Sequence, residues 1–157
     1  MMTKKGGMKM NPYDRTAVSA VWQRVHQSTT EDCLETALRE AIADERHANR
    51  TYAQLARTTG NAMFSRIAAQ EFCHIKKLSS LYYLLYGCPP CQDQQERICI
   101  CNVCQTVRES FASELQAAKK YEELANRHPE HASLFCSIAK TERCHANLLR
   151  SFTEQLL

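Results

Sequence analysis

The sequence predicts an all-α protein: a four-helix bundle with one long crossover between its second and third helices, plus a short N-terminal helix. The chain has 157 residues, the length of one domain, and only four glycines and four prolines interrupt it. Apolar residues recur at helical spacing along most of the chain, whereas the alternating pattern of a strand is weak. We therefore divide the chain into an N-terminal segment, residues 1–28, and a bundle, residues 29–157.

The charge of the chain argues against several classes of protein. Its 20 basic and 17 acidic side chains leave a net charge of +3, which is too balanced for a nucleic-acid-binding or membrane-surface protein. No apolar run reaches the roughly 18 residues that a transmembrane helix needs, and no apolar segment follows the lysines near the start. The sequence therefore predicts a soluble, cytoplasmic protein that binds neither nucleic acid nor membrane.

The first two helices are expected on either side of residue 28. The apolar stripe of the short N-terminal helix consists of Val18, Val21, Trp22 and Val25. Thr29 followed by Asp32 resembles a capping box that opens the first bundle helix. That helix is expected to run to about Arg57, where the segment TTGN interrupts the pattern.

The remaining helices follow in order. The second bundle helix is predicted at about residues 62–86, and residues 88–105 form an irregular, cysteine-rich crossover. Thr106 with Glu109 resembles a capping box that opens the third helix, and the fourth begins near Glu130 after the turn RHPE. A crossover of this length can extend up to about 60 Å, which exceeds the roughly 40 Å of the first bundle helix. It can therefore run the length of the bundle.

An internal repeat relates the two halves of the bundle. The first and third helices share the series Glu45, Ala48, Tyr52, Leu55, Ala56 and Glu114, Ala117, Tyr121, Leu124, Ala125 at identical offsets. The second and fourth share the series Phe64, Ile67, Ala68, Glu71, His74, Leu78 and Phe135, Ile138, Ala139, Glu142, His145, Leu149. The bundle is thus two copies of one helical hairpin, each with a lone Glu and a Glu-x-x-His.

The repeated polar residues are expected to point into the core. At the helical period, Glu71 and His74 lie about 60° apart, on the same face as the apolar residues of their helix. Tyr52 and Tyr121, each seven residues after the lone Glu of its helix, return to within about 20° of that Glu. They are placed to hydrogen-bond a carboxylate.

Four buried carboxylates require compensation, because desolvation and mutual repulsion would each cost several kcal/mol and drive protonation. Two divalent cations would balance four negative charges, and so would a ferric pair bridged by an oxide. The candidate metal ligands are Glu45, Glu71, His74, Glu114, Glu142 and His145. This set is that of di-iron and di-manganese carboxylate bundles. The alternative is a bundle that keeps the pattern without metal.

Four segments resemble the motif helices of rubrerythrins, which belong to the ferritin-like di-iron superfamily. The segments are ADERHANRTY, QEFCHIKKL, ASELQAAKKY and TERCHANLL, and the resemblance covers about residues 30–155. It implies a ferritin-like bundle that binds two iron ions, or manganese, through the six Glu and His residues. It also implies a homodimer that reduces hydrogen peroxide in oxidative-stress defence, with Tyr52 and Tyr121 tuning the carboxylates. The alternative within the superfamily is a ferroxidase or iron-storage-related protein that uses dioxygen and lacks reductase activity. A third is a structural or signalling bundle whose metals only support folding.

Two departures from the rubrerythrin pattern affect the expected chemistry. Rubrerythrins usually carry an additional Glu three residues after the third-helix ligand, and this chain has Ala117 there. Rubrerythrins also commonly carry a C-terminal rubredoxin domain, and this sequence stops at Leu157 without one. We therefore expect electrons to come from a separate donor, such as a rubredoxin-like protein, or from another site.

The crossover carries a second candidate site. Five of the nine cysteines lie between residues 88 and 104. Two Cys-x-x-Cys pairs, formed by Cys88, Cys91, Cys101 and Cys104, could together hold zinc or iron. A redox-active dithiol or disulfide and unliganded thiols are the alternatives, and Cys99 is a spare thiol. Cys73 and Cys144, beside the two histidines, are expected to point away from the metals. They are interpreted as small residues buried against a neighbouring helix or subunit, and a redox role is the alternative.

Overall fold

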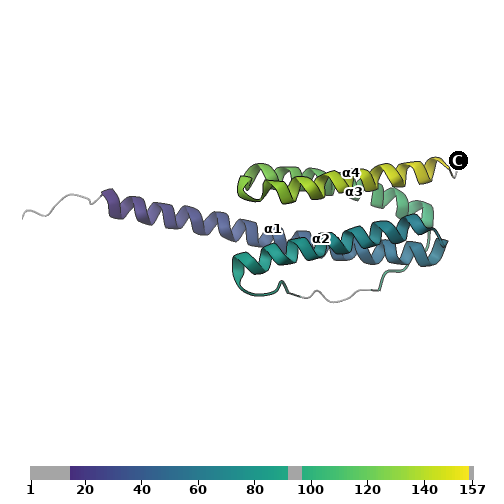
Figure 1. The fold of residues 1–157 in the computed structure, drawn as a ribbon, viewed down its shortest axis with the longest axis horizontal. Coiled ribbons are helices and arrows are strands. Elements are labelled where there is room, and N and C mark those ends of the chain that lie inside the picture. The colour runs from purple at the N-terminus through teal and green to yellow at the C-terminus, as the bar shows by residue number, and fades with distance from the viewer. Residues whose placement is uncertain (1–14, 92–96, 156–157) are drawn as a thin grey trace, which may run out of the picture. The chain divides into compact units, whose positions relative to one another are not determined.

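The computed structural model describes the backbone of residues 15–91 and 97–155, and their side chains from residue 34 onward. It consists of four α-helices, with a short 3₁₀ turn at Pro129–His131 before the last (Figure 1). The helices are α1 (Arg15–Thr59), α2 (Ala62–Tyr86), α3 (Val103–Arg127) and α4 (Ala132–Glu154). No strand occurs within the described ranges. The predicted all-α, ferritin-like four-helix architecture is thus confirmed.

One continuous helix, α1, occupies the region where we expected two helices. Thr29 and Asp32 lie inside α1, so the capping box predicted there is wrong. The sequence between Arg15 and Thr59 contains neither glycine nor proline, and so nothing in it forces the helix to end. The chain forms two compact units, Met1–Ala37 and Leu38–Leu157. The second unit contains the bundle. The predicted boundary between an N-terminal segment, residues 1–28, and the bundle, residues 29–157, stays a prediction.

A tight turn joins α1 to α2. Gly60 ends α1 in the left-handed conformation, with φ of 69°, and its N–H donates to the carbonyl of Ala56. The side chain of Asn61 then accepts a hydrogen bond from the N–H of Met63 at 2.8 Å and caps α2. Because only these two residues separate the helices, α1 and α2 pack antiparallel as one hairpin.

The start of α3 differs from the prediction. Asn102 is the cap, and its Oδ1 accepts the N–H of Gln105 at 3.0 Å. Thr106 lies one turn into the helix, where its hydroxyl donates to the carbonyl of Asn102. The predicted Thr106–Glu109 capping box is therefore wrong, because an Asn four residues earlier satisfies the same free N–H groups. The crossover accordingly ends at Asn102 rather than at residue 105.

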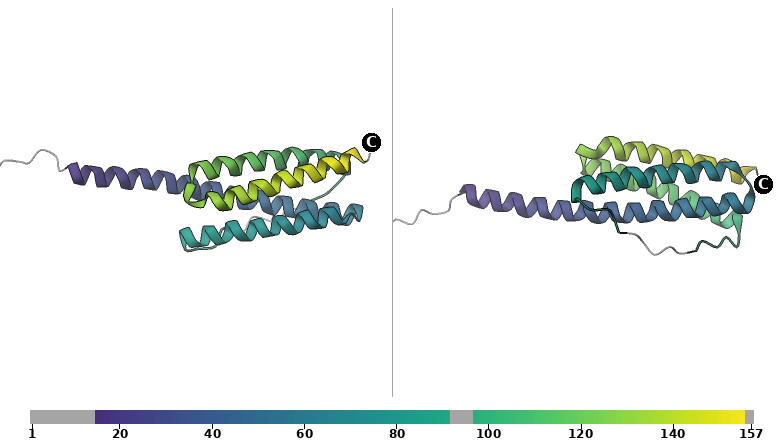
Figure 2. Two further views of the ribbon diagram at one scale, coloured as in Figure 1. Left: turned by 45° about the horizontal axis from the view of Figure 1, so that its top comes forward. Right: turned by 60° about the horizontal axis from the view of Figure 1, so that its bottom comes forward.

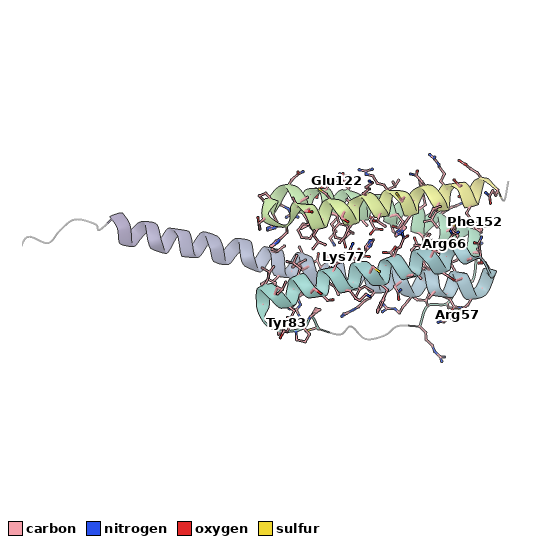
Figure 3. The ribbon with its side chains drawn as sticks, viewed as in Figure 1. Arg57, Arg66, Lys77, Tyr83, Glu122 and Phe152 are labelled. Carbon is pink, nitrogen blue, oxygen red and sulfur yellow. The ribbon has the colours of Figure 1, made fainter. Side chains whose placement is uncertain are left out.

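The core of the bundle follows the internal repeat. The side chains of Phe64, Ile67 and Leu78 on α2 and of Phe135, Ile138 and Leu149 on α4 are fully buried. Figure 3 shows side chains of both hairpins directed into the space between them. These apolar residues orient α2 and α4 so that each Glu-x-x-His also faces inward.

The two described ends of the crossover lie at opposite ends of the bundle (Figure 2). At the start, the carbonyl of Cys91 accepts a hydrogen bond from Arg46 of α1. At the far end, Ile100 and Val103 pack against the core cluster that includes Leu55. The crossover therefore spans the bundle lengthwise, as its length predicted.

Candidate metal centre

The six predicted ligands meet in the middle of the bundle, and every helix contributes to them. Each is at most 4% exposed. They form two overlapping groups, in each of which the ligating atoms lie within 4.8 Å of one another. The groups are Glu45, Glu71, His74, Glu142 and Glu71, Glu114, Glu142, His145. The chain therefore holds two neighbouring positions, each with one histidine and one glutamate of its own and two glutamates in common.

The shared carboxylates each turn one oxygen toward each histidine. Oε2 of Glu71 lies 3.2 Å from Nδ1 of His74, and its Oε1 lies 2.9 Å from Nδ1 of His145. Oε1 of Glu142 lies 2.8 Å from Nδ1 of His74, and its Oε2 lies 3.1 Å from Nδ1 of His145. Carboxylates in this orientation are suited to bridge two metal ions. The geometry thus separates Glu71 and Glu142, which belong to both groups, from Glu45 and Glu114, which each belong to one.

The unshared carboxylates are each held by a tyrosine of the other hairpin. The hydroxyl of Tyr52 donates to Oε1 of Glu114, and the hydroxyl of Tyr121 donates to Oε1 of Glu45. Burial raises the pKa of both phenols well above the ordinary value, so they remain protonated donors. The second oxygen of each carboxylate faces a histidine, at 3.3 Å for Glu45 and His74 and at 3.4 Å for Glu114 and His145. Each phenol therefore orients its carboxylate toward one of the two positions.

In the absence of metal, bound protons compensate the buried negative charge of the carboxylates. Burial raises the pKa of Glu45 and of Glu114 to about 8, so both are protonated at neutral pH. For Glu142, burial is outweighed by His145 and His74, which lower its pKa to about 2.

The histidines carry the matching positive charges. Burial alone would lower their pKa values, but the adjacent carboxylates raise that of His74 to about 11 and that of His145 to about 12. The pKa of Glu71 is lowered because His145 and His74 outweigh the effect of burial. Two imidazolium groups thus face two carboxylates and two carboxylic acids, a neutral cluster whose protons two divalent ions would replace.

Two buried oxygens provide a test of whether a metal fits. Oε1 of Glu71 and Oε1 of Glu142 have no hydrogen-bond partner of acceptable geometry, although each lies close to a histidine nitrogen. A buried carboxylate oxygen without a partner costs free energy unless something else satisfies it. Four carboxylates and two imidazoles form a donor set for transition metals such as iron or manganese. The residues present therefore fit a pair of metal ions.

A cavity of about 560 Å³ reaches the cluster from the side where the crossover meets α3. The carboxylates Glu45, Glu71, Glu114 and Glu142 line it, together with the crossover residues Arg97 to Ile100. Ala117 also lines this cavity, at the position where rubrerythrins usually carry Glu. A small molecule can therefore reach the carboxylates through space that a longer side chain at residue 117 would occupy.

One further side chain contacts the cluster, and the sequence pattern did not reveal it. Oε1 of Gln70 lies 2.8 Å from Nε2 of His145, so the Nε2–H group donates a hydrogen bond to Gln70. Such a contact fixes the ring orientation and directs Nδ1 toward the carboxylates. The equivalent position in the other half is Thr141, whose hydroxyl instead donates to the carbonyl of Ser137. The sequence signals this difference between the two halves only in that Gln70 and Thr141, at equivalent positions of the repeat, are not identical.

The four cysteines predicted as a second metal site are not brought together. Within residues 34–91 and 97–155, the only groups of three or more potential metal ligands are the two Glu/His groups. Cys88 and Cys91 lie at the start of the crossover and Cys101 and Cys104 at or just after its end, and none of the four belongs to either group. The Sγ of Cys91 instead accepts a hydrogen bond from Arg39 at 3.2 Å. Metal binding by these thiols stays a prediction that this arrangement does not support.

The two cysteines beside the ligand histidines lie outside the cluster. Cys73 and Cys144 are exposed in this chain, and neither belongs to a group of potential metal ligands. Burial against a neighbouring helix of the same chain is therefore wrong, whereas burial against another subunit stays a prediction. The expected direction of the two thiols, away from the ligands, agrees with the structure.

Comparison with known proteins supports the same family as the motifs. Residues 105–157, which contain Glu114, Glu142 and His145, match the rubrerythrin family model. The resemblance to rubrerythrins is confirmed. The match supports a ferritin-like protein of the di-iron class, and the buried Glu and His groups of this rubrerythrin-like bundle are able to hold metal.

A solved structure with the same fold comes from Pyrococcus furiosus and is described as hypothetical protein Pfu-1136390-001. The TM-score is 0.66 at 24% identity, and the similarity covers 78% of this chain and 89% of that one. This likeness establishes the fold alone. No curated protein matches the chain. In the described part of the chain, no helix combines the length and the apolar character needed to cross a bilayer.

Proposed function

We propose that this chain is a rubrerythrin-like non-haem di-iron protein that reduces hydrogen peroxide. The observation that carries the proposal is the pair of shared carboxylates, Glu71 and Glu142, each with one oxygen toward each histidine. Glu45 and His74 would complete one iron site, and Glu114 and His145 the other. Two iron ions bound there would supply the two electrons that break the O–O bond of one peroxide.

The protein's own side chains support this chemistry in three ways. Tyr52 and Tyr121 hold the unshared carboxylates in place by hydrogen bonds from buried hydroxyls. The buried apolar faces of α2 and α4 exclude water from the far side of the cluster. The cavity admits a molecule as small as peroxide to the carboxylates. The electrons for repeated turnover would come from a separate carrier, such as a rubredoxin-like protein, and the active form would be a cytoplasmic homodimer.

A ferroxidase that binds iron and reacts with dioxygen is the second candidate. The observation that favours it is Ala117, since this position in the cavity lacks the additional carboxylate of rubrerythrins. Without that carboxylate, the ligand exchange that accompanies their redox cycle cannot take its usual form.

The competing functions differ in the oxidant that they prefer. Protein purified without oxygen and loaded with ferrous iron would be mixed separately with peroxide and with dioxygen, and iron oxidation followed by absorbance. The proposal predicts faster oxidation by peroxide, and faster oxidation by dioxygen would favour the ferroxidase. Glu71→Ala should abolish both reactions, whereas Glu123→Ala, at an exposed glutamate of α3, should leave them unchanged.

A further inference from the structure

The crossover places two thiols side by side. Sγ of Cys99 lies 3.8 Å from Sγ of Cys101, and both side chains are exposed. A disulfide has an S–S length of about 2 Å, so the sulfurs need to approach by roughly another 2 Å. Rotation of two exposed side chains separated by one residue can supply such a movement. No other pair of thiols in the described part of the chain lies in contact.

The same pair adjoins the route to the metal centre. Cys99 lines the cavity whose other walls include Glu45 and Glu114. Ile100, between the two cysteines, packs against the core cluster around Leu55 and fixes this part of the crossover to the bundle. A molecule that reaches the carboxylates through the cavity therefore passes Cys99, and the half-buried Ile100 holds the dithiol against the bundle.

We infer that Cys99 and Cys101 form a reversible dithiol that supplies electrons to the Glu/His centre, an inference that rests on the proposed peroxide reduction. The two thiols lose two electrons and two protons as the S–S bond forms. One hydrogen peroxide takes up the two electrons and two protons, its O–O bond breaks, and two waters result. The pair thus takes the place of a rubredoxin-like carrier as the immediate electron source, and a dithiol reductant restores it.

The protonation state of the thiols favours electron transfer through the Glu/His centre over direct attack of a thiolate on peroxide. The hydrogen bond with Cys101 raises the pKa of the Cys99 thiol. Since the thiolate is the nucleophile toward peroxide, a thiol that keeps its proton reacts with peroxide slowly. A disulfide between residues two apart closes a small, strained ring, and strained disulfides are easily reduced. Easy reduction of the disulfide suits a pair that alternates between dithiol and disulfide in each turnover.

The test counts thiols and peroxide together in the full-length protein. Reduced, iron-loaded protein would receive excess hydrogen peroxide without other reductants, and free thiols would be counted and the disulfide mapped by mass spectrometry. We expect the count to fall from nine thiols to seven, with a Cys99–Cys101 bond. Because the thiols add one two-electron reduction to that of the irons, peroxide consumption should fall from about two equivalents in the wild type to about one in Cys99→Ser.

Three comparisons complete the design. Cys101→Ser should behave as Cys99→Ser does, while Cys136→Ser, at an exposed cysteine of α4, should consume peroxide as the wild type does. If the wild type and Cys99→Ser each consume one equivalent of peroxide, and the wild type keeps both thiols, the dithiol inference is wrong while peroxide reduction stands. If no variant reduces peroxide, the proposed function fails as well. Disulfide formation at the same rate in metal-free protein would overturn the route through the centre.

Discussion

The hydroxyl of Tyr52 on α1 donates a hydrogen bond to Glu114 on α3, which belongs to the other copy of the repeated hairpin. Its counterpart Tyr121 donates to Glu45 in the opposite direction. The repeat predicts that each tyrosine shares a helix face with the glutamate of its own helix and bonds a carboxylate, and the bonds that form cross between the hairpins. The two halves of the ligand set are therefore tied together by buried, reciprocal contacts.

Tyr52→Phe tests what this bond contributes. Loss of the hydroxyl leaves Oε1 of Glu114 without its donor, and we expect the metal-free protein to be destabilised by about 1–3 kcal/mol. Metal affinity should fall by about 10- to 100-fold, because the carboxylate is no longer held toward its position. Thermal unfolding and iron titration measure the two effects. Tyr83→Phe, at an exposed tyrosine of α2, is the control, and equal behaviour of the two variants would contradict this role for Tyr52.

Metal binding should release protons in a defined number. At neutral pH, His74 and His145 are protonated with pKa values of about 11 and 12, and Glu45 and Glu114 with values of about 8. All four groups must lose a proton to act as ligands, so two divalent ions should displace about four protons. Calorimetric titration in buffers of different ionisation enthalpy gives this number. Release of one proton or none would show that the ions bind elsewhere.

The metal-free protein should lose stability as the pH rises from about 5 to 9. The pKa of Glu45 and of Glu114 is near 4.5 when unfolded and about 8 when folded, so the folded state binds more protons between these values. His74 acts in the same direction, since its pKa rises from 6.5 to about 11. Unfolding temperatures measured with a chelator across this range should fall with pH. A rise would contradict the protonated cluster, and metal-loaded protein should not show the fall.

Gln70→Ala should affect the two metal positions unequally. Of the two ligand histidines, Gln70 hydrogen-bonds His145, so we expect weaker binding at the position formed with Glu114 and little change at the position formed with His74. Metal titration should then resolve one tight and one weak site, the weak site shifted by about 10- to 100-fold. Thr141→Ala, at the equivalent residue of α4, is the matched control. Equal weakening of both sites would contradict the assignment of Gln70 to His145.

The repeat in the sequence predicted which Glu and His side chains are buried together, because burial and helical periodicity act on each helix separately. Glu71 and His74 share a face with Phe64 and Ile67, and this relation does not depend on the partner helix. Contacts between helices were harder to predict. The donation from Tyr121 to Glu45 and the contact of Gln70 with His145 depend on how the helices pack, which no local pattern encodes.

Two helix starts and the arrangement of the crossover cysteines were also not predicted correctly from the sequence. The capping boxes at Thr29 and Thr106 lie within helices, because the pattern of residue types recurs where the chain has no reason to turn. Asn61 and Asn102, which do cap, are short polar residues that the local pattern does not single out. The two Cys-x-x-Cys motifs were paired on their separation along the chain, which does not determine whether the four thiols meet in space.

The number of iron ions bound per chain tests the central claim most directly. Metal-free, full-length protein titrated anaerobically with ferrous iron should bind about two ions per chain, as the two groups with shared carboxylates require. Glu71→Ala and Glu142→Ala should each weaken both sites, because each removes a ligand common to the two positions. Fewer than one ion per chain in the wild type, or two ions bound unchanged by both variants, would contradict the dinuclear centre.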